Sequence, residues 1–225
     1  MTINEIIKDL KYFDYKYNSY EVLKDLFIMS ALSISNSTEL NKELFKKRED
    51  EFNQISSKYN KQDMQQFAKI FAKITELYQN EKLNDYIGEI FMQSSTQNSS
   101  AKGQIFTPYP LSLKSAEGII NKEDFEKKDI ITMYEPACGG GGMIVAVVDI
   151  LKNKLKIDYS KRLFVVAGDL DRRCVAMTYV VLSLLGVPAI VQEKNALSGE
   201  LYDIFETPAY KMQYLRFKDV VRGLV

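Results

Sequence analysis

The sequence predicts an α/β fold in which helices cover a parallel sheet and a helical region comes first. Apolar residues at helical spacing dominate residues 1–93. From residue 111 onward, short apolar runs alternate with helical segments, which is typical of right-handed βαβ units. A run of four glycines, 139–142, joins one apolar run to an apolar helical segment. These three observations together predict the fold class.

The first 93 residues are predicted to be helical because their apolar side chains recur every three or four positions. Two such sets are Ile3, Ile6, Ile7, Leu10, Tyr17 and Met64, Phe67, Ile70, Phe71, Ile74, Leu77, Tyr78. Asn36 with Glu39, and Asn60 with Asp63, are spaced as N-cap and N3 residues, so we expect a helix to begin after each asparagine. The aromatic side chains here stand at core positions, and packing explains them without a catalytic role.

A polar, serine-rich stretch at residues 94–100 separates this region from the rest of the chain. We therefore predict a helical domain at 1–97 and a second domain at 98–225. The second domain is expected to contain helices and strands in strict alternation. Their predicted ranges are helix 111–120, strand 130–134, helix 141–155, strand 162–168, helix 171–185 and strand 188–192.

The composition narrows the class of protein. The chain has 225 residues, of which 46% are hydrophobic and 27% are charged. These fractions are typical of soluble globular proteins. No apolar run approaches the roughly 20 residues that span a bilayer, and the N-terminus lacks the features of a signal peptide. Two cysteines, Cys138 and Cys174, and no histidine favour a reduced, cytoplasmic protein and argue against a zinc site or a histidine base. We expect no metal and no membrane.

The charges balance, with 30 basic and 30 acidic side chains. A protein that binds DNA unaided usually has a basic face, because phosphate contacts supply most of the non-specific affinity. The short basic runs 46–48 and 127–128 are interleaved with acids and are best interpreted as solvated helix faces. Any DNA binding is therefore expected to need a partner.

The glycine run is the strongest candidate for a ligand site. Glycine lets the backbone approach a ligand closely, and the start of the following helix offers unpaired N–H groups. A dinucleotide fingerprint needs glycine where Ile144 stands, and a P-loop needs a lysine that is absent. A glycine turn without a ligand is the alternative.

An acidic pair follows the next predicted strand. The apolar run 163–168 ends in Asp169-Leu170-Asp171. In doubly wound folds, an acid at the end of the second strand accepts hydrogen bonds from ribose hydroxyls, and Asp169 is our first choice for this role. Asp171 is the second choice, and it also fits the N-cap of a helix that begins at Arg172.

Two motifs carry a resemblance to a known family. Glu135-Pro136-Ala137-Cys138-Gly139-Gly140-Gly141 resembles the S-adenosylmethionine (SAM) loop of amino-methylating DNA methyltransferases. Gly103-Gln104-Ile105-Phe106-Thr107-Pro108 resembles the upstream motif of their N6-adenine group, which includes methylation subunits of type I restriction systems and small phage-type proteins. A preceding segment with Asp85 and Gly88, at Asp-x-x-Gly spacing, also fits this group. The resemblance covers most of residues 84–210.

This resemblance implies a Rossmann-like, SAM-dependent methyltransferase core. Because only residues 211–225 follow the last motif, the parallel sheet is expected to be truncated. SAM is the implied cofactor. The residues implied to bind it are Thr107, Glu135, Ala137, Gly139, Gly141, Asp169 and Asn195.

Individual roles follow from the family pattern. Thr107 matches a position that binds the SAM carboxylate. Glu135 stands where the family more often has Asp and would meet the SAM ammonium. Asn195 matches a position that contacts the adenine of SAM, although a turn residue is an equally good interpretation.

The family's catalytic motif is Asn/Asp-Pro-Pro-Tyr/Phe, and the corresponding stretch here is Thr207-Pro208-Ala209-Tyr210. Thr207, Pro208 and Tyr210 are therefore the implied catalytic residues. The Thr207 hydroxyl and the Pro208 carbonyl would accept hydrogen bonds from the adenine amine, and the Tyr210 ring would stack on the flipped base.

These features predict a SAM-dependent DNA methyltransferase that acts on adenine N6, encoded by a phage or mobile element. The alternative is a catalytically impaired relative that acts as a partner-binding subunit in restriction–modification or anti-restriction. A nicotinamide enzyme is disfavoured by Ile144. The strand before Thr207 would be a sheet edge, so the tail 211–225 is expected to cover it or to form a homodimer or hetero-complex.

Overall fold

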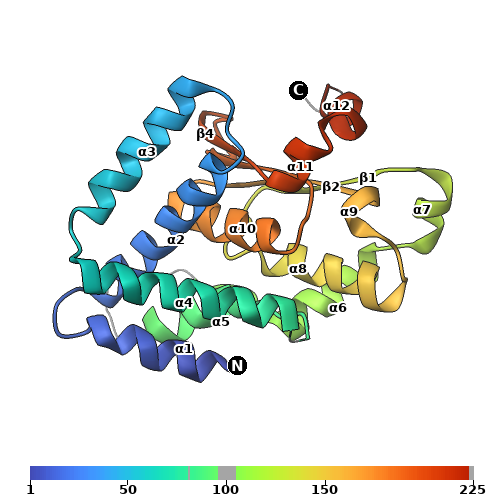
Figure 1. Ribbon diagram of the computed structural model, residues 1–225. Helices are drawn as coiled ribbons and strands as arrows, with labels where there is room; N and C mark the ends of the chain where they lie inside the picture. Colours follow the sequence, from blue (N-terminus) through green and yellow to red (C-terminus); the bar gives the residue numbers. More distant parts are fainter. Residues whose placement is uncertain (81, 96–104, 223–225) are drawn as a thin grey trace.

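The computed structural model describes residues 1–80, 82–95 and 105–222 (Figure 1). Its first region is helical, as predicted. The elements are α1 (Ile3–Leu10), a 3-10 turn η1 (Lys11–Phe13), α2 (Ser19–Asn36), α3 (Lys42–Ser56), α4 (Lys61–Asn80) and α5 (Tyr86–Ser95). The predicted domain boundary at 97/98, and Gly103 and Gln104 of the upstream motif, lie outside the described residues.

The second region alternates helices and strands, and the predicted α/β fold class is confirmed. Its elements are α6 (Tyr109–Ile119), α7 (Lys122–Lys127), β1 (Ile131–Glu135), α8 (Gly142–Asp149), a π-helical continuation η3 (Ile150–Lys154), α9 (Tyr159–Arg162), β2 (Leu163–Asp169), α10 (Arg172–Leu184), β3 (Ala189–Lys194), β4 (Leu201–Glu206), α11 (Pro208–Met212) and α12 (Tyr214–Arg222). The predicted helix 141–155 is thus wound as an α-helix only in its first part.

One of the two predicted N-cap pairs is correct. Asn60 accepts a hydrogen bond from the Asp63 N–H at 2.9 Å, and Asp63 accepts one from the Asn60 N–H at 3.1 Å, which is a reciprocal capping box. The pair Asn36 and Glu39 is wrong, because α2 continues through Asn36 and the next helix is capped by Asn41. The Glu39 carboxylate instead pairs with Arg48 at 3.1 Å.

The sheet has the order β1-β2-β3-β4. The first three strands are parallel, and β4 runs antiparallel to β3. This last strand corrects the predicted truncated parallel sheet. Only residues 195–200 join β3 to β4, and a parallel neighbour needs a crossover of a dozen or more residues.

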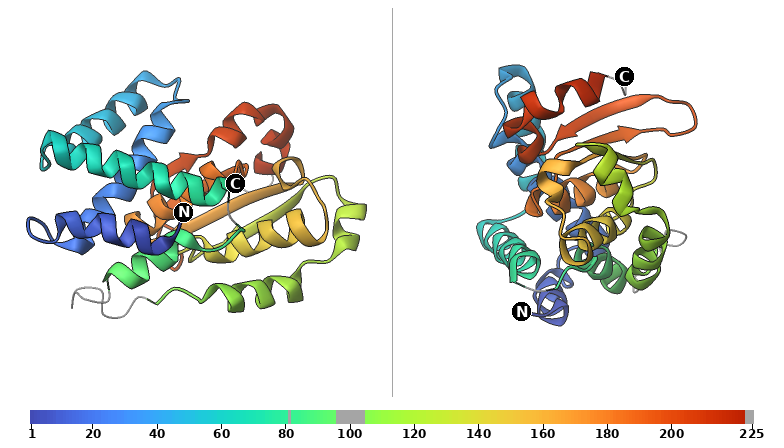
Figure 2. Two further views of the ribbon diagram at one scale, coloured as in Figure 1. Left: turned by 60° about the horizontal axis from the view of Figure 1, so that its bottom comes forward. Right: turned by 90° about the vertical axis from the view of Figure 1, so that its right-hand side faces the viewer.

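Helices cover both faces of the sheet. Alternate side chains of β2 point to opposite faces, so Leu163 and Val165 join the core beneath α8 and α10. Phe164 faces the other way and packs against Tyr210 of α11 and Phe217 of α12. Figure 2 shows the red C-terminal helices and the yellow α8 on opposite sides of the strands. Helix α12 of the tail therefore packs on one face of the sheet. The covering of the edge strand β4 by the tail or by a second subunit stays a prediction.

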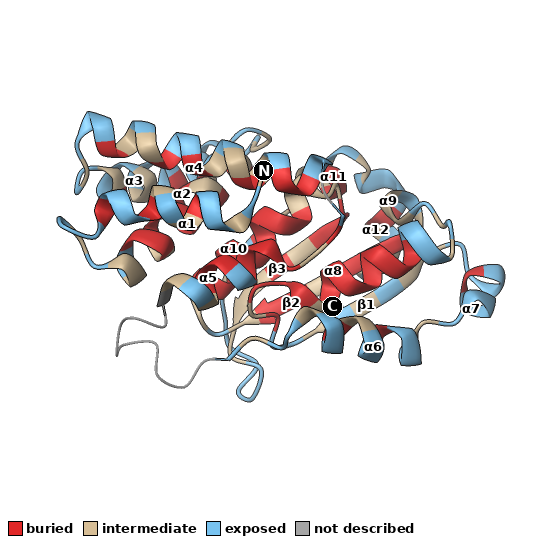
Figure 3. Ribbon diagram, turned by 90° about the horizontal axis from the view of Figure 1, so that it is seen from below, coloured by how far each residue is buried: buried red, intermediate tan, exposed pale blue. Residues whose placement is uncertain are grey.

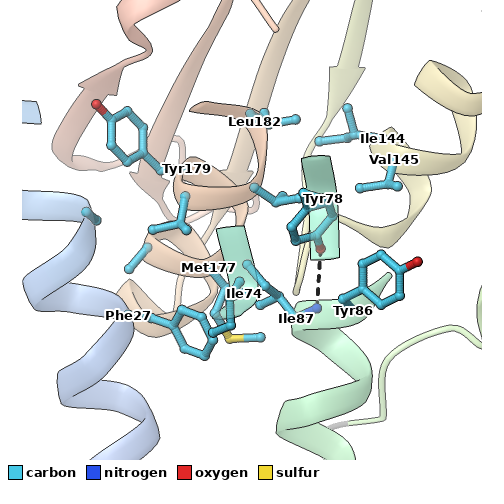
Figure 4. Close-up of a cluster of buried hydrophobic side chains, with 14 of the residues drawn as sticks. Phe27, Ile74, Tyr78, Tyr86, Ile87, Ile144, Val145, Met177, Tyr179 and Leu182 are labelled. Atoms are coloured by element: carbon cyan, nitrogen blue, oxygen red, sulfur yellow. Dashed lines mark hydrogen bonds between the residues drawn. The ribbon is translucent and has the colours of Figure 1, made fainter. Parts of the chain in front are cut away.

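One hydrophobic core extends across both regions. Figure 3 shows the buried residues concentrated in α5, α8, α10 and β2. In the close-up of Figure 4, Phe27 of α2 and Ile87 of α5 lie beside Met177 of α10. The Tyr78 hydroxyl of α4 accepts a hydrogen bond from the Ile87 N–H at 3.3 Å, and burial raises the pKa of Tyr78 well above its ordinary value.

Helix α3 lies against the hairpin of β3 and β4. Arg48 is buried and donates to the Ile204 carbonyl at 2.8 Å, which uses an acceptor on the outermost strand. Arg172 joins Glu51 of α3 to Glu193 of β3, with 2.6 Å to each carboxylate. In the part of the chain that the structure describes, no helix is both long enough and apolar enough to cross a membrane.

Candidate functional site

The glycine turn follows β1 at the carboxyl edge of the parallel strands. Gly139 and Gly141 have φ angles of 53° and 87°, in the left-handed region that favours glycine. A Cβ atom on Gly139 would lie 3.1 Å from the Phe106 ring, and one on Gly141 would lie 2.9 Å from Val181. Glycine is therefore required at both positions by the backbone and by close packing.

Asp169 joins the end of β2 to this turn. One carboxylate oxygen accepts a hydrogen bond from the Gly139 N–H at 3.0 Å, and the other accepts one from the Asp171 N–H at 2.9 Å. The structure thus brings Asp169 and Gly139 together. Asp171 caps α10 through the Arg173 N–H at 2.9 Å, as its alternative role predicts.

Glu135 ends β1 and begins the turn. Its carboxylate accepts a hydrogen bond from the Ala137 N–H at 3.2 Å, which holds these two predicted residues together. Burial raises the pKa of Glu135, and the nearby Asp169 raises it further. A carboxylate in this position favours a ligand that carries positive charge.

A cavity of about 220 Å³ opens beside the turn. It adjoins a second hollow of about 490 Å³, and both are lined by Asp85, Ile105, Phe106 and Thr107. The first is also lined by the turn itself, through Glu135, Ala137, Cys138, Gly139, Gly140 and Gly142. No lysine or arginine is among the described residues that line either hollow.

The described part of the upstream motif, residues 105–108, adjoins the turn. The Phe106 ring lies against Gly139 and 5.5 Å from the ring of Phe91 in α5. Thr107 is exposed and lines both hollows, and Pro108 is the N-cap of α6 immediately after it. Thr107 therefore lines the same cavity as Glu135 and the glycine turn.

Asp85 also lines both hollows and was not among the predicted site residues. It precedes α5 and accepts a hydrogen bond from the Gly88 N–H at 2.9 Å. Burial raises the pKa of Asp85 to about 6. The Asp-x-x-Gly spacing in the sequence was the signal that could have identified it.

Asn195 lies in the hairpin turn between β3 and β4. Its side-chain oxygen accepts hydrogen bonds from the Leu197 and Ser198 N–H groups at 3.0 and 3.2 Å. The structure therefore gives Asn195 the turn role that was its alternative interpretation. It shares the carboxyl edge with Asp169 but does not line either hollow.

The predicted catalytic residues lie at the opposite edge of the sheet. Thr207 is fully buried, and its hydroxyl donates to the Val187 carbonyl at 2.8 Å and accepts from the Ala189 N–H at 2.9 Å, at the start of β3. Tyr210 is buried against Phe164, with ring centres 5.3 Å apart. Neither Thr207, Pro208 nor Tyr210 lines the cavity at the glycine turn. Because β4 is antiparallel, its end lies where the parallel strands begin.

The site can hold a small ligand that carries both charges. The N–H groups that open α8 attract an anion such as a carboxylate. Asp85 and Glu135 attract a cation, and no basic side chain among the lining residues in 1–80, 82–95 and 105–222 competes for them. Within the described ranges, no group of histidine, cysteine and acidic side chains could hold a metal ion.

Comparisons with known proteins found a family and a solved structure to which this chain is similar. Residues 79–188 match the model of a family described as N-6 DNA methylase, which confirms the predicted resemblance. No curated protein matches the chain. A solved structure from Listeria monocytogenes, assigned to the class I S-adenosylmethionine-dependent methyltransferases, is similar with a TM-score of 0.39 and 14% identity. The match covers 84% of this chain and 53% of that protein, so the chain spans about half of its length.

The matched segment contains the whole glycine turn and the wall that faces it. It begins in α4 and ends just before β3, so it includes Asp85, Thr107, Glu135 and Asp169. This similarity is the basis of the function proposed below. The hairpin with Asn195 and the stretch from Thr207 to Tyr210 lie beyond the match.

Proposed function

We propose that this chain, with its N-6 DNA methylase segment, binds SAM beside the glycine turn and transfers the methyl group to adenine N6 in DNA. The observation that carries the proposal is the cavity lined by the turn and Thr107, with carboxylates on its walls and no basic residue among the described lining. Adenine as the target, a role in restriction–modification and a phage or mobile-element origin stay predictions.

The residues around the cavity fit the cofactor. A Cβ on Gly139 would crowd Phe106, so glycine keeps the space between turn and wall open. Asp169 retains lone pairs after its two backbone hydrogen bonds and is suited to ribose hydroxyls. Thr107 and the start of α8 are suited to the carboxylate of the amino-acid tail. Glu135 provides negative charge near its positively charged end.

Bound SAM supplies a methyl group on a positively charged sulfur. In the proposed reaction a bond forms between adenine N6 and the methyl carbon as the carbon–sulfur bond breaks. The amine then loses a proton to water. The contribution of this chain is to fix the cofactor and to keep the methyl group at a mouth that the target base can reach.

Calorimetric titration with SAM tests the cofactor site. We expect wild-type protein to bind, and Asp169→Ala to bind about tenfold to a hundredfold more weakly, since a charge-assisted hydrogen bond contributes about 1.5–3 kcal/mol. Asp158→Ala is a matched control, because that exposed acid pairs with Lys161 near α9. Absence of binding by folded wild-type protein at millimolar SAM would refute the proposal.

A second function is favoured by the position of Thr207 and Tyr210. Because these residues are buried in the hydrophobic core at the other edge, the base-binding groups have no counterpart in the described cavity lining. We propose as the alternative a SAM-binding subunit whose partner supplies the groups that hold the flipped adenine. Such a subunit would bind SAM but methylate DNA only in the presence of the partner.

Labelled SAM and AT-rich DNA distinguish the two functions. The protein is incubated with both, alone and with host-cell extract, and label in N6-methyladenine is measured. Turnover by the isolated protein would support the complete enzyme. Label that appears only with extract, and only while Asp169 is intact, would support the subunit.

A further inference from the structure

Asp85 has a buried carboxylate with one oxygen unused. The residue is 6% exposed, and its Oδ1 accepts the Gly88 N–H at 2.9 Å. This bond is the ordinary N-cap interaction at the start of α5 and needs only one oxygen. Oδ2 accepts no hydrogen bond from any residue that the structure describes. Helix capping therefore accounts for only half of this carboxylate.

The unused oxygen is held between the first turns of two helices. A Cβ atom on Gly88 of α5 would lie 2.3 Å from Asp85 Oδ2, and one on Gly142 of α8 would lie 2.4 Å from it. No side chain fits at either position while Asp85 keeps this orientation. Because Asp85 also lines both hollows, Oδ2 meets the cavity at the point where α8 begins.

Among the residues that the structure describes, none with a positive charge faces Asp85 to balance it. The titratable groups that face it are Tyr78 of α4, Tyr86 and Glu89 of α5, Tyr109 of α6 and Glu135 of β1. All of these are neutral or acidic. A buried charge is costly unless it is paired, so this carboxylate is suited to a cation that arrives with a ligand.

We infer that Asp85 is a counter-ion for the ammonium group of the amino-acid tail of SAM, alongside Glu135. The inference rests on the proposed function and assigns a binding role to a residue of the helical region. The tail carries an ammonium and a carboxylate on one carbon, and the site offers a carboxylate and helix N–H groups side by side. Asp85 thereby makes the site select ligands with this positive group.

The test compares ligands that separate the tail from the charge on sulfur. SAM carries the ammonium and the carboxylate with a positive sulfur, S-adenosylhomocysteine carries both groups with a neutral sulfur, and 5′-methylthioadenosine has a neutral sulfur and neither group. Each is titrated calorimetrically into wild-type protein and Asp85→Asn, whose amide oxygen can still accept the Gly88 N–H. Asp25→Asn is the matched control, because Asp25 is a buried acid of the helical region that pairs with Lys58 and lies outside both hollows.

We expect Asp85→Asn to weaken the binding of SAM and of S-adenosylhomocysteine by about tenfold to a hundredfold, and that of methylthioadenosine by less than about twofold. Asp25→Asn should leave all three affinities within about twofold. Equal losses for SAM and methylthioadenosine, or no loss for either, would overturn the inference and leave the proposed function standing. If folded wild-type protein bound none of the three ligands, the proposed function itself would fail.

Proton release provides a second readout. Asp85, with a pKa of about 6, is about half protonated at pH 6, and pairing with an ammonium would displace that proton. Calorimetry at pH 6 in two buffers of different ionisation enthalpy should show about half a proton more released by wild-type protein than by Asp85→Asn. Glu135 contributes equally in both proteins. Identical proton release would overturn the inference even if affinity fell.

Discussion

The two edges of the sheet carry similar short motifs with opposite properties. Glu135-Pro136 stands at the end of β1 at the carboxyl edge. Beside it are a cavity and the Oδ2 atom of Asp85, which accepts no hydrogen bond from a described residue. Thr207-Pro208 follows β4, and the Thr207 hydroxyl is satisfied from two sides by the backbone at the start of β3. A strand's direction therefore decides which edge a motif reaches, and the residue types alone do not.

The two edges also differ in the kind of side chain that is buried there. At the carboxyl edge, burial raises the pKa of Asp85 and of Glu135. Ionisation of these two side chains is therefore less favourable in the folded protein than in water. At the amino edge Tyr210 and Phe217 fill the space against Phe164. We therefore expect substitutions at the amino edge to affect folding, and those at the carboxyl edge to affect ligand binding and pH dependence.

Tyr210→Ala is expected to have the largest effect. The ring is 2% exposed and packs on Phe164 at 5.3 Å, so its removal should lower the free energy of unfolding by about 3–5 kcal/mol. SAM affinity of the folded protein should not change. Urea denaturation and calorimetry measure the two quantities, with Tyr15→Ala, at 99% exposure, as the control. A loss of SAM affinity with little loss of stability would place Tyr210 in the site.

The pH dependence of stability should reveal Asp85. Folding raises its pKa from 3.8 to about 6, so the folded state binds more protons than the unfolded state between these values. The free energy of unfolding of wild-type protein, relative to Asp85→Asn, should therefore fall as pH rises from 4 to 8. Because the pKa shift is about two units, this change in the free energy of unfolding should not exceed about 3 kcal/mol. Urea denaturation at both pH values checks this, and a constant difference between the proteins would contradict it.

The substitution Thr207→Asn has different expected outcomes under the family pattern and under the structure. The pattern predicts a gain of methylation, because Asn is the residue of the family motif. The structure predicts a loss of about 1–3 kcal/mol in stability and no gain, because a larger amide must replace a hydroxyl with two backbone partners. Thr207→Ser, which keeps the hydroxyl, is the control. Methylation by a folded, active Thr207→Asn protein would restore the catalytic assignment.

Tyr134→Ser should have the smallest effect. Tyr134 is 58% exposed on β1, whose one partner strand among the described residues is β2, so the free energy of unfolding should change by less than about 0.5 kcal/mol. Denaturation at two protein concentrations is the measurement. A larger, concentration-dependent loss would indicate that a second copy covers this strand, as the predicted homodimer would require.

Local patterns were sufficient to predict most of the elements that form the site. The apolar runs located β1, β2 and β3 within one or two residues, and the glycines located the turn. These features depend on neighbouring residues. The direction of β4 was not predicted, although the six connecting residues, 195–200, are too few for a crossover to a parallel strand. As a result, Thr207 was predicted at the wrong edge of the sheet.

Asp85 shows the limit of local patterns more clearly. Its spacing to Gly88 is visible in the sequence, but its contact with Gly142 joins residues far apart in the chain. The wrong N-cap prediction at Asn36 has a similar origin, because the Glu39 carboxylate pairs with Arg48 and does not cap a helix. In each case a long-range partner determines what a locally ambiguous side chain does.

The shared core has a consequence for how such a protein can evolve. Phe27 and Ile74 from the helical region interlock with Met177 beside the sheet, and α5 brings Asp85 to the cavity (Figure 4). Recombination that exchanged the first 95 residues for those of a distant relative would have to match that buried surface and preserve one wall of the pocket. An exchange of the helical region alone would therefore disturb both the core and the pocket.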